Sequence, residues 1–450
     1  MPSRDQLIAE LLEETVRARR RRLHITGTMD FRLLALQTVD RKIDRNVRAL
    51  SVFGQATLDA IEKEISSCVH GPVLDALVHI AAACCMEMHV HPQADDLAAR
   101  WFSRYGEHHR TAFRDAWWFH PQSRQGDAAR IARTAALLAS NSEAMQALGV
   151  ELAGRCGIAS SVPRITALAA ELPDGHLLRA CELALCRLNH PPADLPARIH
   201  RRGTGDTDAL LHALRLVAAS GRLELIQTSG YLQCTRMQHP ALQRLAWCLA
   251  TLSDPVQAHR LALEDASLDD GMRWRVLALA GFPEGLVHLG RSVLQQTSGA
   301  TPAQLDALWT FLGEVPAEIR DKAAPPEIRE QALRLAVLQA LRNAHVGVTN
   351  QAKQAEWTPE AMLAATDPGQ SRRLRFGSAI RRREDGGAAL APAALQLATL
   401  MRQALYIEQS VQSGRSVGAG LSAYAPSRHQ VQVIGLSAWL AEVQSSEPAA

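Results

Sequence analysis

Helix-breaking residues recur along the middle of this 450-residue chain at intervals of about 30 residues, and this spacing restricts the fold more than any other feature. The breakers stand at Gly157, Asn189–Pro192, Gly221, Asp254–Pro255 and Gly281–Pro283. Each one follows an apolar run with the i, i+3, i+4 spacing of an amphipathic helix, and each precedes a second apolar segment. A helix, a short turn and another helix, repeated at this period, predict an α-solenoid of stacked helical hairpins.

The composition favours the same all-α class. Hydrophobic residues make up 47% of the chain, but aromatic residues only 4%. Ala and Leu together supply roughly 30% of the residues, and these side chains lose little rotamer freedom in a helix. β-branched and aromatic residues are too few for an all-β sandwich. We therefore predict an all-α protein with a HEAT-like α-solenoid, and an irregular helical bundle with evenly spaced loops is the alternative.

The pattern divides the chain into three regions. Residues 1–124 are predicted to form an N-terminal helical region, residues 125–299 the HEAT-like solenoid, and residues 300–450 a C-terminal helical region. In the flanking regions we expect helices over 4–22, 31–50, 55–69, 72–88, 302–313, 326–346, 359–366, 391–413 and 431–443.

Charge, cysteine usage and the N-terminus bear on the cellular compartment. The formal net charge is +3, from 49 basic and 46 acidic residues, so no global attraction to nucleic acid is expected. The eight cysteines form no C-x-x-C pair and several lie in apolar helical runs, which is typical of free thiols in a reducing compartment. No signal peptide is apparent, and the best apolar stretch, 76–86, is too short to span a bilayer. We expect a cytoplasmic bacterial protein.

The segment from Leu36 to Leu50, closed by Gly54, resembles the N-terminal signature of an uncharacterised bacterial HEAT-repeat family encoded near type VI secretion genes. The C-terminal segments 373–377, 402–414 and 424–430 are similar to the end of that family's sequences. The chain departs from the family pattern at Val39 and Asn46, where Leu and His are more frequent. The resemblance implies HEAT-like repeats and a role in type VI secretion, in handling an effector or a spike component before loading.

Aromatic residues gather in one segment of an otherwise aromatic-poor chain, with seven of the twenty aromatics inside 19 residues. Trp and Tyr dominate binding hot spots, so one interpretation is a partner-binding patch formed by Trp101, Tyr105, Trp117, Trp118 and His120. Two adjacent tryptophans cannot both face one helix stripe, so at least one of Trp117 and Trp118 is expected to be exposed. The alternative is a core that joins the N-terminal helices to the solenoid.

Two motifs resemble chemical sites. Gly414–Gly418 matches G-x-S-x-G, but a helix precedes it and only His429, with no Asp, follows, so a loop at a helix end is favoured over a hydrolase elbow. His89 and His91, with Asp95 nearby, could contribute metal ligands. H-x-H places both rings on one side only in a strand, so a solvated helix terminus is favoured, and we expect no metal or cofactor.

Arginine clusters at 17–22 and 372–383 could bind phosphate or acidic protein. Acidic residues flank both clusters and no aromatics are interleaved, so solvated helix faces are favoured and nucleic-acid binding is not expected. We predict a non-enzymatic protein-interaction scaffold or adaptor. The alternatives are an immunity protein that blocks a toxin, and an enzyme related to HEAT-like bilin lyases or DNA glycosylases.

Overall fold

The computed structural model describes most of the chain, which divides into two compact units between Leu195 and Pro196. This division falls inside 125–299, and the three-part division of the sequence stays a prediction. The residues described are 3–28, 33–68, 71–88, 100, 110–119, 126–203, 206–266, 268–296, 299–321, 323–343, 374–375, 378–379 and 399–413.

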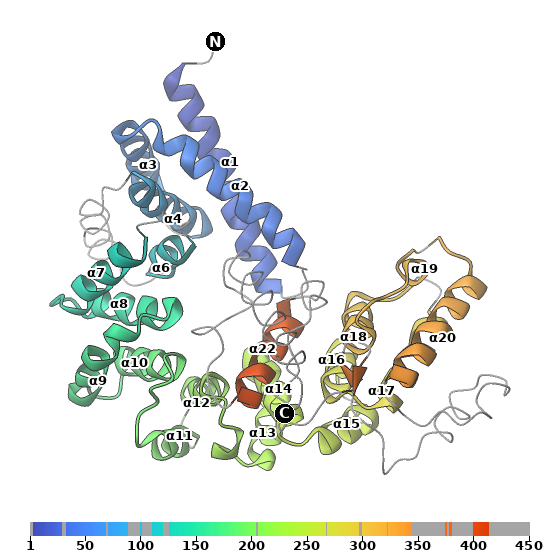
Figure 1. Cartoon of the computed structure of the whole chain (residues 1–450). Coiled ribbons are helices and arrows are strands. Elements are labelled where there is room, and N and C mark those ends of the chain that lie inside the picture. The colour runs from blue at the N-terminus through green and yellow to red at the C-terminus, as the bar shows by residue number, and fades with distance from the viewer. Residues whose placement is uncertain are drawn as a thin grey trace, which may run out of the picture. The chain divides into compact units, whose positions relative to one another are not determined.

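The first unit is built from helices (Figure 1). They are α1 (Arg4–Thr28), α2 (Leu33–Ser51), α3 (Gln55–Ser67), α4 (Pro72–Glu87), α6 (Arg110–Phe119), α7 (Gly126–Leu138), α8 (Glu143–Cys156), α9 (Val162–Glu171) and α10 (His176–Arg187), with the short 3-10 helix η2 (Ala159–Ser161). Alternate helices stack in one layer, because α4 packs on α6, α6 on α8 and α8 on α10. Helices α7 and α9 pack beside α8 and α10 as the second members of helical pairs.

The second unit repeats this layering. Its elements are α11 (Leu195–Gly203), α12 (Thr207–Ser220), η3 (Leu223–Leu225), α13 (Thr228–Thr235), α14 (Pro240–Ser253), α15 (Pro255–Glu264), α16 (Asp270–Ala280), α17 (Pro283–Gln295), α18 (Pro302–Leu312), α19 (Ala317–Arg320), α20 (Pro326–Asn343), β1 (Leu374–Arg375), β2 (Ser378–Ala379) and α22 (Thr399–Ser413). Helices α12, α14, α16 and α18 stack in chain order, with α13, α15 and α17 beside them (Figure 1). Apart from strands β1 and β2, an antiparallel pair of two residues each, the regular structure of the described residues is helical, and the prediction of an all-α fold is confirmed there.

The predicted helix breakers do end helices. Gly221 and Gly281 follow the last residues of α12 and α16 with φ of 70° and 79°, a left-handed conformation that glycine adopts without strain. Asp254 accepts a hydrogen bond from the backbone N–H of Gln257 (2.9 Å) and so caps the start of α15. The 30-residue spacing therefore reflects helix ends, as the sequence indicated.

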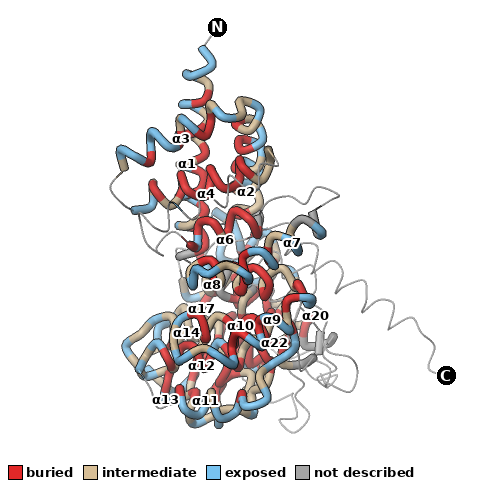
Figure 2. Tube along the Cα trace, turned by 90° about the vertical axis from the view of Figure 1, so that its left-hand side faces the viewer, coloured by how far each residue is buried: buried red, intermediate tan, exposed pale blue. Residues whose placement is uncertain are grey.

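Helix α4 forms the centre of the first unit. Its buried residues include nearly every position from Leu74 to Cys85, and it packs against α1, α2, α3 and α6. Figure 2 shows α4 mostly as buried, with exposed residues on neighbouring α3. A helix that is apolar on all sides requires neighbours on all sides, and α4 has them. None of the helices described is both long and apolar enough to cross a membrane.

Helix α22 belongs to the second unit and packs on α12 and α16. Five consecutive residues of this helix, 404–408, are buried. The contact with α12 is close at Gly221, where a Cβ atom would lie only 2.3 Å from the carbonyl oxygen of Ser410. The lack of a side chain at Gly221 therefore allows α22 to approach the end of α12.

Candidate protein-binding groove

The groove lies in the second unit, between α19 and α20, which pack against each other. Helix α18 ends at Leu312 and is followed by Gly313, whose φ of 78° turns the chain, and α20 begins with Pro326. Proline suits the first turn of a helix because its fixed φ fits and its missing N–H would have had no partner there. Glu327 follows in the first turn, where a negative charge favours the helix.

Helix α20 carries apolar residues on two different sides. Leu333, Val337 and Ala340 are buried, and α20 packs against α17 and α18. Ile328 and Leu335 are 48% and 60% exposed, and their separation of seven positions places them on one face, roughly opposite the buried stripe. A helix with two apolar sides is suited to packing on both, and the structure described covers only one of them.

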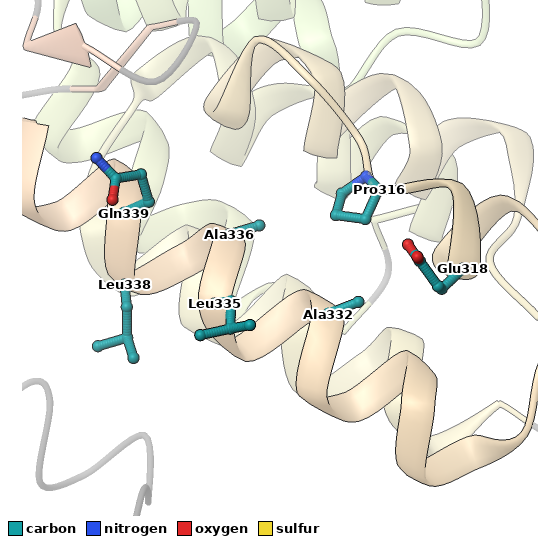
Figure 3. Close-up of a pocket in the computed structure, with 7 residues that line it drawn as sticks. All are labelled: Pro316, Glu318, Ala332, Leu335, Ala336, Leu338 and Gln339. Carbon is teal, nitrogen blue, oxygen red and sulfur yellow. The ribbon is translucent and has the colours of Figure 1, made fainter.

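The exposed side of α20 borders a hollow of about 500 Å³. Its lining residues are Pro316, Glu318, Ala332, Leu335, Ala336, Leu338 and Gln339. In Figure 3, Ala332 and Ala336 lie on the side of α20 nearer to Pro316 and Glu318, whereas Leu338 points the other way. The small alanine side chains leave the space, and the flanking leucines make its border apolar.

Charge in this groove comes from Glu318. Its side chain is exposed, and within the described part of the chain it has no ion-pair or hydrogen-bond partner. The carboxylate of Glu330, on α20 outside the lining of the groove, is paired with Arg334 at 3.2 Å. The groove therefore offers an apolar surface with one free carboxylate at its border.

Trp117 and Trp118, predicted as part of a partner-binding patch, are both buried, at 2% and 6% exposed. The expectation that one of them is exposed was wrong, because α6 packs between α4 and α8 and has no free side there. The guanidinium of Arg133 lies 4.2 Å from the ring centre of Trp117, and that of Arg155 lies 4.5 Å from Trp118. These two tryptophans are core residues covered by arginines.

The arginine run 17–22 is only partly a solvated face, which corrects the sequence prediction. Arg17, Arg20 and Arg21 are exposed, but Arg19 and Arg22 are buried. Arg19 donates to Asp115 on α6 at 2.8 Å and lies 3.9 Å from Asp75 on α4. Arg22 donates to Asp40 on α2 at 2.7 Å. Helical periodicity places these two arginines on the inner side of α1, where they connect α1 to three other helices.

The charged contacts continue from α6 to α10. Arg114 pairs with Asp115 (2.8 Å) and Glu151 (3.1 Å), and Arg110 reaches Glu151 (3.3 Å) and the imidazole of His176 (2.6 Å). Burial raises the pKa of Asp115, but Arg114 and Arg19 outweigh this effect and bring the pKa well below its ordinary value. The carboxylate therefore stays ionised inside the first unit, and the network holds helices together instead of exposing reactive groups.

The remaining predicted sites lie outside the described residues. These are Trp101, Tyr105, His120, His89, His91, Gly414–Gly418 and all of the arginines of the second cluster except Arg375, which lies in β1. Where the structure is described, no three His, Cys, Asp or Glu side chains gather as a metal site would require. All eight cysteines lie in the described residues, and none of them forms a disulfide.

No protein-family model matches the chain, and no curated protein matches it either.

Proposed function

We propose that this protein is a non-enzymatic scaffold with HEAT-like repeats that binds another protein through the groove between α19 and α20. The layering supports the repeat assignment, because pairs such as α13–α14 and α15–α16 follow one another and alternate helices stack. Arrays of this kind usually end in a repeat with a polar outer face. Within the described residues, α20 is the last helix that packs on α17 and α18, and it has the exposed Ile328 and Leu335 on the side away from them. This exposed apolar stripe is the observation that carries the proposal.

The proposed occupant is an amphipathic helix of the partner protein. Ile328, Ala332 and Leu335 follow the i, i+4, i+7 spacing that helix-in-groove contacts use. Eighteen residues of α20 extend about 27 Å, enough to pack along several turns of a second helix. The free carboxylate of Glu318 at the border favours a partner with a lysine or arginine beside its apolar stripe.

The cellular role that we propose is that of a cytoplasmic adaptor in type VI secretion. It is supported by the resemblance of the segment Leu36–Leu50 and of the C-terminal segments to a bacterial HEAT-repeat family encoded near type VI secretion genes. The partner would then be an effector or a spike component that is held before loading. The assignment of the groove itself does not depend on this role.

The test compares two substitutions of exposed isoleucines on helices. Ile328 on α20 is 48% exposed and Ile131 on α7 is 43% exposed, so Ile328→Glu and Ile131→Glu place the same charge at matched positions, one on the exposed apolar stripe of α20 beside the groove and one elsewhere. Each protein would be used to capture partners from a lysate of the source bacterium. We expect a partner that wild type and Ile131→Glu retain and that Ile328→Glu loses.

Binding of the captured partner would then be measured with purified proteins. A charge placed in an apolar contact should weaken binding by about 2 kcal/mol or more, roughly thirtyfold in Kd. Leu335→Glu should act in the same way, while circular dichroism and the melting temperature stay close to those of the wild type. Equal loss in both isoleucine variants, or undiminished binding by Ile328→Glu and Leu335→Glu, would contradict the groove assignment.

A further inference from the structure

A second hollow, of about 360 Å³, lies in the second unit where the end of α15 meets α16 and α17. It is lined by Leu263, Glu264, Ala266, Arg273, Trp274, Leu277 and His288. It shares no lining residue with the groove between α19 and α20. Its volume suits a side chain or a small molecule, and its lining combines an aromatic ring with two ionisable groups that could contact a ligand.

Arg273 forms part of the wall and is fully engaged. Its guanidinium donates to the backbone carbonyls of Ala262 (3.1 Å), Asp265 (3.0 Å) and Leu268 (3.2 Å). Its remaining amino group is paired with Asp270 at 2.6 Å. Arg273 therefore fixes the chain between α15 and α16, and its charge is balanced before any ligand enters.

Glu264 supplies the charge of the hollow. It is the last residue of α15 and is exposed, and none of the described residues forms an ion pair or hydrogen bond with its carboxylate. His288, on α17, lines the same space. Burial and the neighbouring Arg291 lower the pKa of His288, so its imidazole is neutral at pH 7 and one ring nitrogen can accept a hydrogen bond.

The aromatic part of the lining is Trp274. This residue is half-buried and packs against the apolar cluster that contains Trp247, Val276 and Leu277. Packing of this kind holds the indole in place, so a ligand need not order it on binding. Leu263, 37% exposed, extends the apolar border of the hollow.

We propose that this hollow is a binding site for a guanidinium group on an alkyl chain. A guanidinium is planar, stacks on tryptophan and carries several N–H donors. Trp274 provides the ring, the Glu264 carboxylate provides the opposite charge and two acceptor oxygens, and His288 provides a further acceptor. The alkyl chain lies against Leu263. The ligand is either an arginine side chain of a protein or a free guanidino compound, and the site is independent of the proposed groove.

The experiment uses the full chain labelled with 5-fluorotryptophan and followed by fluorine NMR, with Trp274→Phe identifying the resonance of Trp274. N-acetyl-arginine amide is titrated against N-acetyl-citrulline amide, which has the same shape without the charge. We expect a saturable shift of the Trp274 resonance with the arginine compound, and binding weaker by about tenfold or more with the citrulline compound. Glu264→Gln should weaken the arginine compound similarly, whereas Glu318→Gln, in the other groove, should leave it unchanged.

Several outcomes would overturn the site. They are equal binding of the citrulline compound, undiminished binding by Glu264→Gln, equal or tighter binding of N-acetyl-lysine amide, and no movement of the Trp274 resonance. If the arginine compound binds as expected, butylguanidinium and a glycine pentapeptide with a central arginine identify the source. The tighter of the two indicates whether the hollow takes a free compound or a protein side chain.

Discussion

Asp115 is the residue on which the charged network of the first unit depends. Its carboxylate accepts a hydrogen bond from Arg19 on α1 at 2.8 Å and forms an ion pair with Arg114 on its own helix. Asp115 is only 6% exposed. Charges buried to this extent contribute little net stability as a complete set, because their removal from water offsets their attraction. Removal of one member is costly, because the remaining charges stay buried without full compensation.

The substitution Asp115→Ala is therefore expected to destabilise the protein by about 3 kcal/mol. This is the lower end of the cost of breaking a buried ion pair, because Asp75 remains 3.9 Å from Arg19 and still balances part of its charge. The control is Glu13→Ala, which breaks the exposed pair of Glu13 with Arg17 and should cost less than about 1 kcal/mol. Urea unfolding followed by circular dichroism measures both. Similar losses in the two variants would contradict the central role of Asp115.

His79 adds a dependence on pH in the same place. Its ring is buried, its Nδ1–H donates to the carbonyl oxygen of Ala112 (3.3 Å), and burial together with the cation of Arg19 keeps its pKa well below the ordinary value. Below about pH 6.5 the unfolded chain binds a proton that the folded chain does not, so stability falls as the pH is lowered.

We expect the free energy of unfolding to fall by up to about 1.4 kcal/mol per pH unit through His79 between about pH 6.5 and pH 5. His79→Gln, which keeps an N–H donor but does not titrate, should show a shallower slope over that range. Asp115 does not interfere, because its lowered pKa affects stability only below about pH 4. Parallel slopes of wild type and His79→Gln would rule out this contribution.

Residue environments were only partly predictable from the sequence. Adjacent residues such as Trp117 and Trp118 lie on different sides of a helix, so the sequence predicts that one of them is exposed. This prediction holds only if α6 has a side that no other helix covers. The run from Arg17 to Arg22 is continuous in sequence, yet helical periodicity turns Arg19 and Arg22 inward. A sequence shows the charge of Arg19, but its partners Asp75 and Asp115 lie 56 and 96 positions further along the chain. Such pairing is decided by tertiary packing.

At the scale of elements, the helix ends were the most predictable feature, because glycine and proline act locally. The helix expected at 72–88 is α4 at Pro72–Glu87, and the one expected at 302–313 is α18 at Pro302–Leu312. Helix α13 (Thr228–Thr235) was not anticipated, since its short polar sequence lacks a clear period. The two apolar stripes of α20 are visible in its sequence. Only packing shows that Leu333 is covered and Leu335 is not.

The contact between α12 and α22 yields a prediction for Gly221→Ala. A Cβ atom there would lie 2.3 Å from the carbonyl oxygen of Ser410, and the φ of 70° adds strain for any other residue. Gly157→Ala is the control, because Gly157 follows the last residue of α8 in the same left-handed conformation, with φ of 70°. We expect Gly221→Ala to destabilise by at least about 1 kcal/mol more than Gly157→Ala, as overpacking does. Equal losses in urea unfolding would indicate that α22 does not press on α12.

At the scale of the whole molecule, the division at Leu195 was not anticipated, because the helix-breaker spacing runs on through it without a change. Each unit has buried clusters of its own, one around Leu177 and Cys181 and another around Trp247 and Leu277. A period read from sequence reports local helix ends, whereas a division into units depends on contacts between distant helices. The number of cooperative units is therefore a property that only the structure could suggest.

Two units with separate cores should unfold in two calorimetric transitions. Asp115→Ala removes a contact within the first unit and Gly221→Ala disturbs one within the second, so each should lower one transition and leave the other in place. In the double variant both transitions should move by the amounts seen singly, because distant and uncoupled sites add. Differential scanning calorimetry measures the four proteins directly. A single transition that both substitutions lower together would mean that the helical array unfolds as one body, and the division at Leu195 would then have no thermodynamic meaning.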